Sequence, residues 1–62
     1  MYQLEKQTME FFDVQITTDL GEVVVIQVTA STPQEAEMTA IYMVNSGEAG
    51  TISRNVIDCF AL

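Results

Sequence analysis

The sequence feature that most restricts the fold is a helix start placed directly after a β-branched segment. Thr32 can cap the helix, Pro33 occupies its first position, and Glu35 completes a capping box three residues after Thr32. We predict a helix from Pro33 to about Asn45, where an Asn-Ser-Gly sequence ends it. A strand therefore leads into a helix that returns along it.

Two strands are predicted before this helix. Residues 9–18 alternate apolar and polar side chains, a pattern typical of a half-buried strand. Residues 22–30 are rich in β-branched side chains and form the second strand. Gly21 permits the positive φ of a bulged hairpin loop between them. The side chains of the second strand expected to face the core are Val24, Ile26, Val28 and Ala30.

A third strand is predicted over residues 51–60, where the alternation is poor and a bulge near Asn55 would restore it. Because the helix returns antiparallel to the second strand, the third strand can pair beside the first. This predicts a three-stranded antiparallel sheet in the order 2-1-3, with one helix on one face. The fold class is α+β, a two-layer β-β-α-β sandwich. The outer strands leave exposed edges, and the apolar residues 23–26 favour pairing of one edge with a partner chain.

The whole chain, residues 1–62, is predicted to form a single domain. The polar residues 1–8 are expected to be either a loose arm or an extension of the first strand.

The predicted helix has apolar side chains on two sides. The face expected to pack on the sheet consists of Ala36, Ala40, Met43 and Val44. The roughly opposite side carries Met38, Ile41 and Tyr42. This second side either contacts a partner or forms a homodimer seam, or Tyr42 covers the edge of a crowded core with its hydroxyl in water.

The composition excludes most enzyme chemistry. The chain has no histidine and a single cysteine, Cys59, which removes histidine-based catalysis, a cysteine-based zinc site and an internal disulfide framework. We therefore expect no catalytic residue, no cofactor, no metal and no enzymatic activity. No targeting or membrane-spanning segment is recognised, so we expect a cytoplasmic location.

Nine acidic residues against two basic ones give a net charge of −7. Such a chain is repelled by nucleic acid and anionic membranes and is steered toward a basic surface. The acidic residues of the first hairpin are Glu10, Asp13, Asp19 and Glu22. They either guard the sheet edges as solvated charges or form an anionic strip that fits the nucleic-acid-binding channel of another protein.

Arg54 is the one basic residue within the predicted elements. Two roles are open for its guanidinium. It either forms an internal ion pair with Asp58 or Asp13, or it makes a bidentate contact to a carboxylate of a partner.

Two segments resemble a family of bacteriophage proteins that inhibit the host RNA polymerase in short-tailed coliphages. One segment is the second strand with the helix start Ala30-Ser31-Thr32-Pro33-Gln34-Glu35-Ala36. The other runs from Gly50 to Cys59, with a glycine and a cysteine at matching separation, and together they cover about half the chain. The resemblance implies binding to the jaw of the largest polymerase subunit and a negatively charged surface that keeps host DNA misplaced. That surface would consist of Glu10, Asp13, Asp19 and Glu22.

The last strand departs from the family pattern. The family has two alternating arginines there, whereas the matching positions of this chain hold Asn55 and Ile57. The arginine of this chain, Arg54, lies one residue before the first of these positions. The segment between the helix start and Gly50 is also about two residues longer. The polymerase contact is therefore not transferred residue by residue.

These observations favour a small phage or mobile-element protein that binds and inhibits a host nucleic-acid enzyme, with RNA polymerase as the favoured target. The expected partner-binding residues are the four hairpin carboxylates together with Arg54, Met38, Ile41 and Tyr42. An anti-CRISPR or anti-restriction inhibitor would use the same physics. A structural or oligomerising module that uses the exposed edge strand and the Tyr42 face is the alternative of another class.

Overall fold

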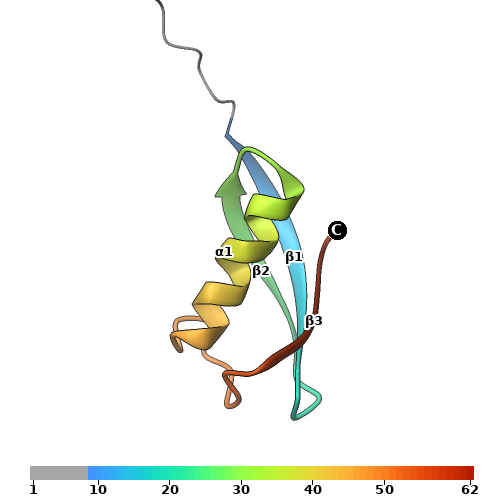
Figure 1. Cartoon of the computed structure of the whole chain (residues 1–62), viewed down its shortest axis with the longest axis vertical. Coiled ribbons are helices and arrows are strands. Elements are labelled where there is room, and N and C mark those ends of the chain that lie inside the picture. Colours follow the sequence, from blue (N-terminus) through green and yellow to red (C-terminus); the bar gives the residue numbers. More distant parts are fainter. Residues whose placement is uncertain (1–8) are drawn as a thin grey trace, which may run out of the picture.

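Three strands and one helix follow one another in the order β-β-α-β (Figure 1). The computed structural model describes residues 9–62, so the prediction for residues 1–8 falls outside the described residues. The elements are β1 (Glu10–Thr18), β2 (Val23–Ala30), α1 (Pro33–Asn45) and β3 (Val56–Ala61). The strands form an antiparallel sheet in the order β2-β1-β3, which confirms the predicted α+β fold.

The helix begins where the sequence predicts, because its first turn is capped. The Thr32 hydroxyl accepts a hydrogen bond from the Glu35 N–H at 3.1 Å. The Glu35 carboxylate reaches one residue further back than an ordinary capping box and accepts from the Ser31 N–H at 2.9 Å. These bonds fix the angle at which the chain leaves β2 and enters α1.

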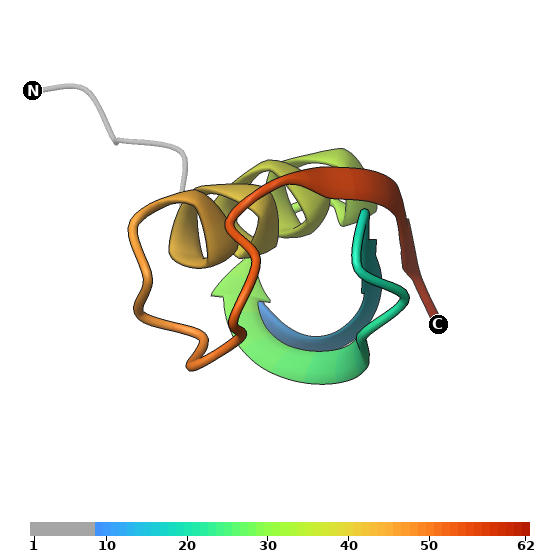
Figure 2. The same cartoon turned by 90° about the horizontal axis from the view of Figure 1, so that it is seen from below.

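Small side chains let α1 lie close to the sheet. Figure 2 shows the helix over the concave side of a strongly curved sheet. The buried core consists of Val14, Ile16, Val28, Ala30, Ala36, Ala40 and Val44. Met43 is half-buried against this core, as predicted, but Ile41 is also half-buried there. Ile41 therefore does not share the outer side of the helix with Met38 and Tyr42.

The β1–β2 hairpin turns through a bulged loop, as predicted. Gly21 has a φ of 83°, its N–H donates to the Thr18 carbonyl at 3.0 Å, and the Thr18 N–H donates to the Glu22 carbonyl at 2.9 Å. A side chain at the Gly21 position would make this left-handed conformation unfavourable. From this loop the two strands pair without interruption up to Glu10 and Ala30.

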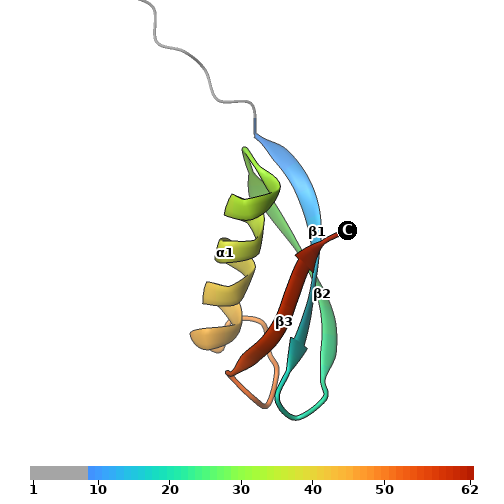
Figure 3. The same ribbon diagram turned by 45° about the vertical axis from the view of Figure 1, so that its right-hand side comes forward.

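The third strand is shorter than predicted, because residues 51–55 form a loop (Figure 3). In that loop the Thr51 hydroxyl donates to the Ser53 carbonyl and the Asn55 N–H donates to the Ser53 hydroxyl. The register also shifts by one residue where β3 meets the end of β1. The predicted bulge is therefore present and lies at Ile57, two residues after Asn55, since Asp58 faces Thr17 and Val56 faces Thr18.

Replacement of Ala40 by leucine tests whether the helix needs a small residue at its contact with the sheet. Ala40 is fully buried, so Ala40→Leu should overpack the interface and lower the free energy of unfolding by about 1–3 kcal/mol. Urea unfolding measures the change as a lower midpoint with an unchanged slope. The control is Thr39→Leu at the neighbouring exposed position, which should stay within about 0.5 kcal/mol of the wild type. Equal effects of the two substitutions would contradict this packing.

Candidate functional site

The four hairpin carboxylates do not form one continuous strip. Glu10 begins β1 and Asp19 follows its other end, which separates them by about 30 Å at the usual rise of a strand. Asp13 faces Gln27 across the sheet and lies on the face that α1 leaves uncovered, since the buried Val14 points the other way. The fold brings together Asp19 and Glu22 at the hairpin turn.

The Glu22 carboxylate holds the loop 51–55 against the hairpin. Its Oε1 accepts from the Ser53 N–H at 2.9 Å and from the Thr18 hydroxyl at 3.0 Å, and its Oε2 accepts from the Ile52 N–H at 2.8 Å. The backbone N–H groups of Ser53 and Ile52 lower the pKa of Glu22, because they stabilise the ionised form. Glu22 is therefore an anchor between two distant parts of the chain.

Asp19 adds a second set of bonds at the same place. Its Oδ1 accepts from the Ser53 hydroxyl, its Oδ2 accepts from the Asn55 amide nitrogen at 3.3 Å, and its N–H donates to the Asn55 carbonyl at 3.1 Å. We call the contacts among Thr18, Asp19, Glu22, residues 52 and 53, and Asn55 the hairpin–loop junction. Sequence reasoning missed Ser53 and Asn55, because nothing in a single sequence links a loop to a hairpin 30 residues earlier.

Arg54 is exposed and lies over the backbone of the preceding loop. A Cβ atom at Gly47 would stand 3.0 Å from its Nη2, and the Asn45 side-chain amide donates to the Arg54 carbonyl at 2.6 Å. Within residues 9–62 the guanidinium makes no ion pair with Asp13 or Asp58, so neither internal pair considered from the sequence is formed. The charge stays accessible to a partner.

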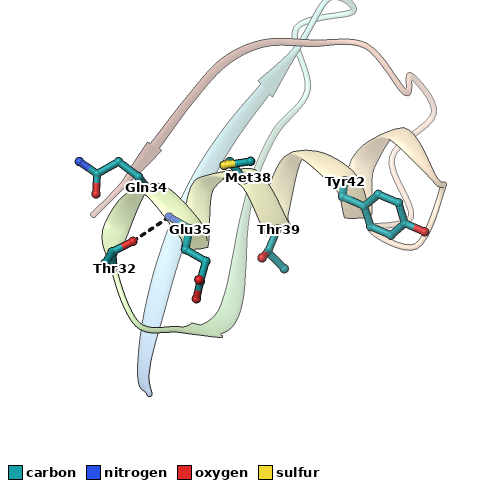
Figure 4. Close-up of a pocket in the computed structure, with 6 residues that line it drawn as sticks. All are labelled: Thr32, Gln34, Glu35, Met38, Thr39 and Tyr42. Atoms are coloured by element: carbon teal, nitrogen blue, oxygen red, sulfur yellow. Dashed lines mark hydrogen bonds between the residues drawn. The ribbon is translucent and has the colours of Figure 1, made fainter. Parts of the chain in front are cut away.

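The outer side of α1 carries a shallow groove of about 550 Å³ (Figure 4). Its lining residues are Thr32, Gln34, Glu35, Met38, Thr39 and Tyr42. Met38 and Tyr42 are largely exposed, which leaves an apolar contact surface beside the capped start of the helix. Two of its polar groups, the Thr32 hydroxyl and the Glu35 carboxylate, are engaged in the hydrogen bonds that cap the helix.

The thiol of Cys59 is not disposed toward nucleophilic chemistry. Partial burial raises the pKa of Cys59, and the nearby carboxylates of Glu37 and Asp58 raise it further. Because the thiolate is the reactive form, this environment disfavours reaction at neutral pH. Among residues 9–62, no three or more histidine, cysteine, aspartate or glutamate side chains gather as metal ligands would.

No family model, curated protein or solved structure matches this chain. The one helix that the structure describes is too short to cross a membrane.

Replacing Glu22 with glutamine tests the hairpin–loop junction through its pH dependence. The folded chain holds the pKa of Glu22 below its ordinary value of 4.5, so its contribution to stability is present above pH 4.5 and is lost as pH falls below it. At pH 7, Glu22→Gln should unfold at a lower urea concentration than the wild type. The gap between the two midpoints should narrow as pH falls below 4.5.

The matched control is Glu48→Gln, because Glu48 is exposed and its carboxylate takes no part in the junction. That substitution should leave the urea midpoint nearly unchanged at pH 7. A gap for Glu22→Gln that is the same at pH 3 and pH 7 would contradict the role given to its ionised carboxylate.

Proposed function

We propose that this chain is a stoichiometric inhibitor, encoded by a phage or mobile element, that binds a basic nucleic-acid-binding surface of a host enzyme. RNA polymerase is the target that we favour. The proposal rests on one observation, the lack of neutralisation within the fold. Arg54 is the one cation among residues 9–62, and it lies over Gly47 and not against a carboxylate. The negative charge is therefore available to a partner.

The carboxylates of Asp19 and Glu22 in the hairpin–loop junction support this function through their long-range electrostatic field and not by direct contact with the target. Hydrogen bonds from backbone N–H groups favour the ionised form of Glu22, so its charge is retained while its position is fixed. A fixed negative field accelerates encounter with a basic channel and is screened by salt. The side-chain oxygens of Asp19 and Glu22 are, however, already occupied by the loop.

Direct contact is assigned to the uncovered face of the sheet. Asp13 and Asp58 are both exposed on this face, because Asp58 pairs with Thr17 and Asp13 has the same alternation along β1. Their carboxylates make no side-chain hydrogen bond within residues 9–62. We infer that this face occupies a channel that otherwise holds phosphates. Inhibition is then steric and electrostatic, without turnover.

A defence nuclease, such as a CRISPR effector or a restriction enzyme, also has a basic channel, and it is the alternative target. The negative charge of this chain would favour binding to either class of enzyme. Binding measured side by side on purified bacterial RNA polymerase and on such a nuclease distinguishes them. If the chain binds the nuclease and not RNA polymerase, RNA polymerase is rejected as the target, while the electrostatic mechanism of inhibition stays in place.

Charge reversal on the uncovered face tests the proposed contact. Asp13→Lys and Asp58→Lys should each weaken binding to purified bacterial RNA polymerase core enzyme by about tenfold, mainly through slower association. Biolayer interferometry at several salt concentrations gives the rates, and promoter-directed transcription gives the inhibition. Reversal of Asp19 or Glu22 is unsuitable, because it would also break the hairpin–loop junction.

The matched control is Glu48→Lys, which makes the same change of charge in the loop after α1. It should reduce affinity less than either aspartate variant, since it alters the overall field without touching the proposed contact face. Equal losses in all three variants would reject the contact face. Unchanged, salt-independent binding in all three would reject the electrostatic mechanism.

A further inference from the structure

The two outer edges of the sheet are protected to different degrees. On β3 the outward N–H of Ala61 donates to the Glu37 carboxylate of α1 at 2.9 Å, and the strand carries a bulge at Ile57 and the charge of Asp58. Natural sheets use such bulges, charges and covering groups to prevent pairing with other chains. The β3 edge is therefore guarded.

The β2 edge has none of these features. From Val23 to Ala30 the strand contains no charged residue and no proline, and its register with β1 is uninterrupted. Within residues 9–62, β1 is its one pairing partner in the sheet. An edge of this length without a blocking feature is a template for an added strand.

The hydrogen-bond pattern shows which backbone groups are free on this edge. The bond from the Thr18 N–H to the Glu22 carbonyl makes these two residues a hydrogen-bonded pair. Pairs alternate along an antiparallel ladder, so every second residue of β2 turns its N–H and C=O away from β1. The residues with outward backbone groups are Val23, Val25, Gln27 and Thr29.

Carboxylates lie at both ends of this uncharged edge. Glu22 directly precedes β2. At the far end, Glu10 pairs with Ala30, and the Glu35 carboxylate is bonded to Ser31. A strand laid along β2 would therefore have an uncharged middle opposite an uncharged edge. Its ends would lie in the negative field of Glu22 and Glu35, and of Glu10, which is one strand further away on β1.

We propose that the β2 edge receives an extended segment of the target protein, uncharged in its middle and flanked by lysine or arginine at both ends. This deepens the proposed function, on which it rests, by naming the mode of contact. Backbone hydrogen bonds to β2 supply affinity. The Glu22 and Glu35 carboxylates near its ends are held by hydrogen bonds within the fold, so they favour a basic partner through their charge and not through direct contact.

A second copy of this chain fits the β2 edge less well than a basic segment. In a two-fold antiparallel pairing of β2 with itself, the Glu22 end of each copy meets the Ala30 end of the other. The negative charge of the Glu22 end then lies near the negative charge of Glu35, with Glu10 one strand further away, at both ends of the interface. Like charges brought together in this way disfavour association.

The first arm of the test uses a synthetic peptide and needs no polymerase. The probe has a Thr-Val-Thr-Val-Thr centre with two lysines at each end, and the control peptide has glutamates in place of the lysines. With the lysine peptide, the amide exchange of Val23, Val25, Gln27 and Thr29 should slow at least about tenfold, whereas the glutamate peptide should have no such effect. Lack of protection by the lysine peptide, or equal protection by both, would overturn the proposal.

The second arm uses full-length variants and RNA polymerase core enzyme. Proline is tolerated on an edge strand where the N–H points outward, so Val25→Pro should remain folded while it removes one donor of the added strand. Val25→Thr is the matched control, because it keeps both the N–H and the β-branched shape. We expect Val25→Pro to weaken polymerase binding at least about tenfold and Val25→Thr to leave it nearly unchanged.

The two arms separate failure of this inference from failure of the proposed function. Polymerase inhibition that is equal in Val25→Pro and Val25→Thr would overturn the edge contact and keep the proposed function. If the lysine peptide protects the β2 amides but the chain does not bind RNA polymerase, the result would support strand addition at the β2 edge and reject RNA polymerase as the target. A wild-type dimer in sedimentation that Val25→Pro dissociates would overturn the proposal in favour of a second copy. Should Val25→Pro not fold, the peptide arm decides alone.

Discussion

The carboxylate of Glu22 joins two parts of the chain that are 30 residues apart, and the end of the sheet depends on this contact. It accepts hydrogen bonds from the N–H groups of Ile52 and Ser53 and so fixes the position of the loop that leads into β3. Asp19 adds the bonds to Ser53 and Asn55, after which β3 can pair with β1. The core itself is small and rich in alanine and valine. Polar contacts such as these therefore hold segments in place that a larger domain would hold by burying apolar side chains.

Because the hairpin–loop junction uses two of the acidic side chains, not all of the negative charge is available for direct contact with a partner. The acidic hairpin looks like a contact surface in the sequence, yet the structure uses its two turn carboxylates as internal acceptors. Their charge still contributes to the field of the molecule, whereas we propose that direct contact is made by the uncovered sheet face and the β2 edge. A chain with so little positive charge can thus separate long-range attraction from the surface that makes contact.

Local signals predicted the fold well. The capped start of α1, the alternation of β1 and the glycine of the hairpin each act within a few residues, and together with the chirality of connections they lead to the order β2-β1-β3. The sequence was less informative where distant residues meet. The bulge at Ile57 and the loop before β3 depend on bonds to the hairpin, and the half-burial of Ile41 depends on how closely two buried alanines bring α1 to the sheet. The proposed contact surfaces depend on the same tertiary arrangement, which periodicity alone does not reveal.

Amide hydrogen exchange on the free chain compares the hairpin–loop junction with the open β2 edge in a single experiment. We expect the amides of Ile52 and Ser53 to exchange slowly although they lie in a loop, since both donate to Glu22. We expect the amides of Val25 and Gln27 to exchange rapidly although they lie in a strand, since they point away from β1. Rapid exchange at Ile52 and Ser53 together with protection at Val25 and Gln27 would contradict both the structural role of the hairpin carboxylates and the open β2 edge.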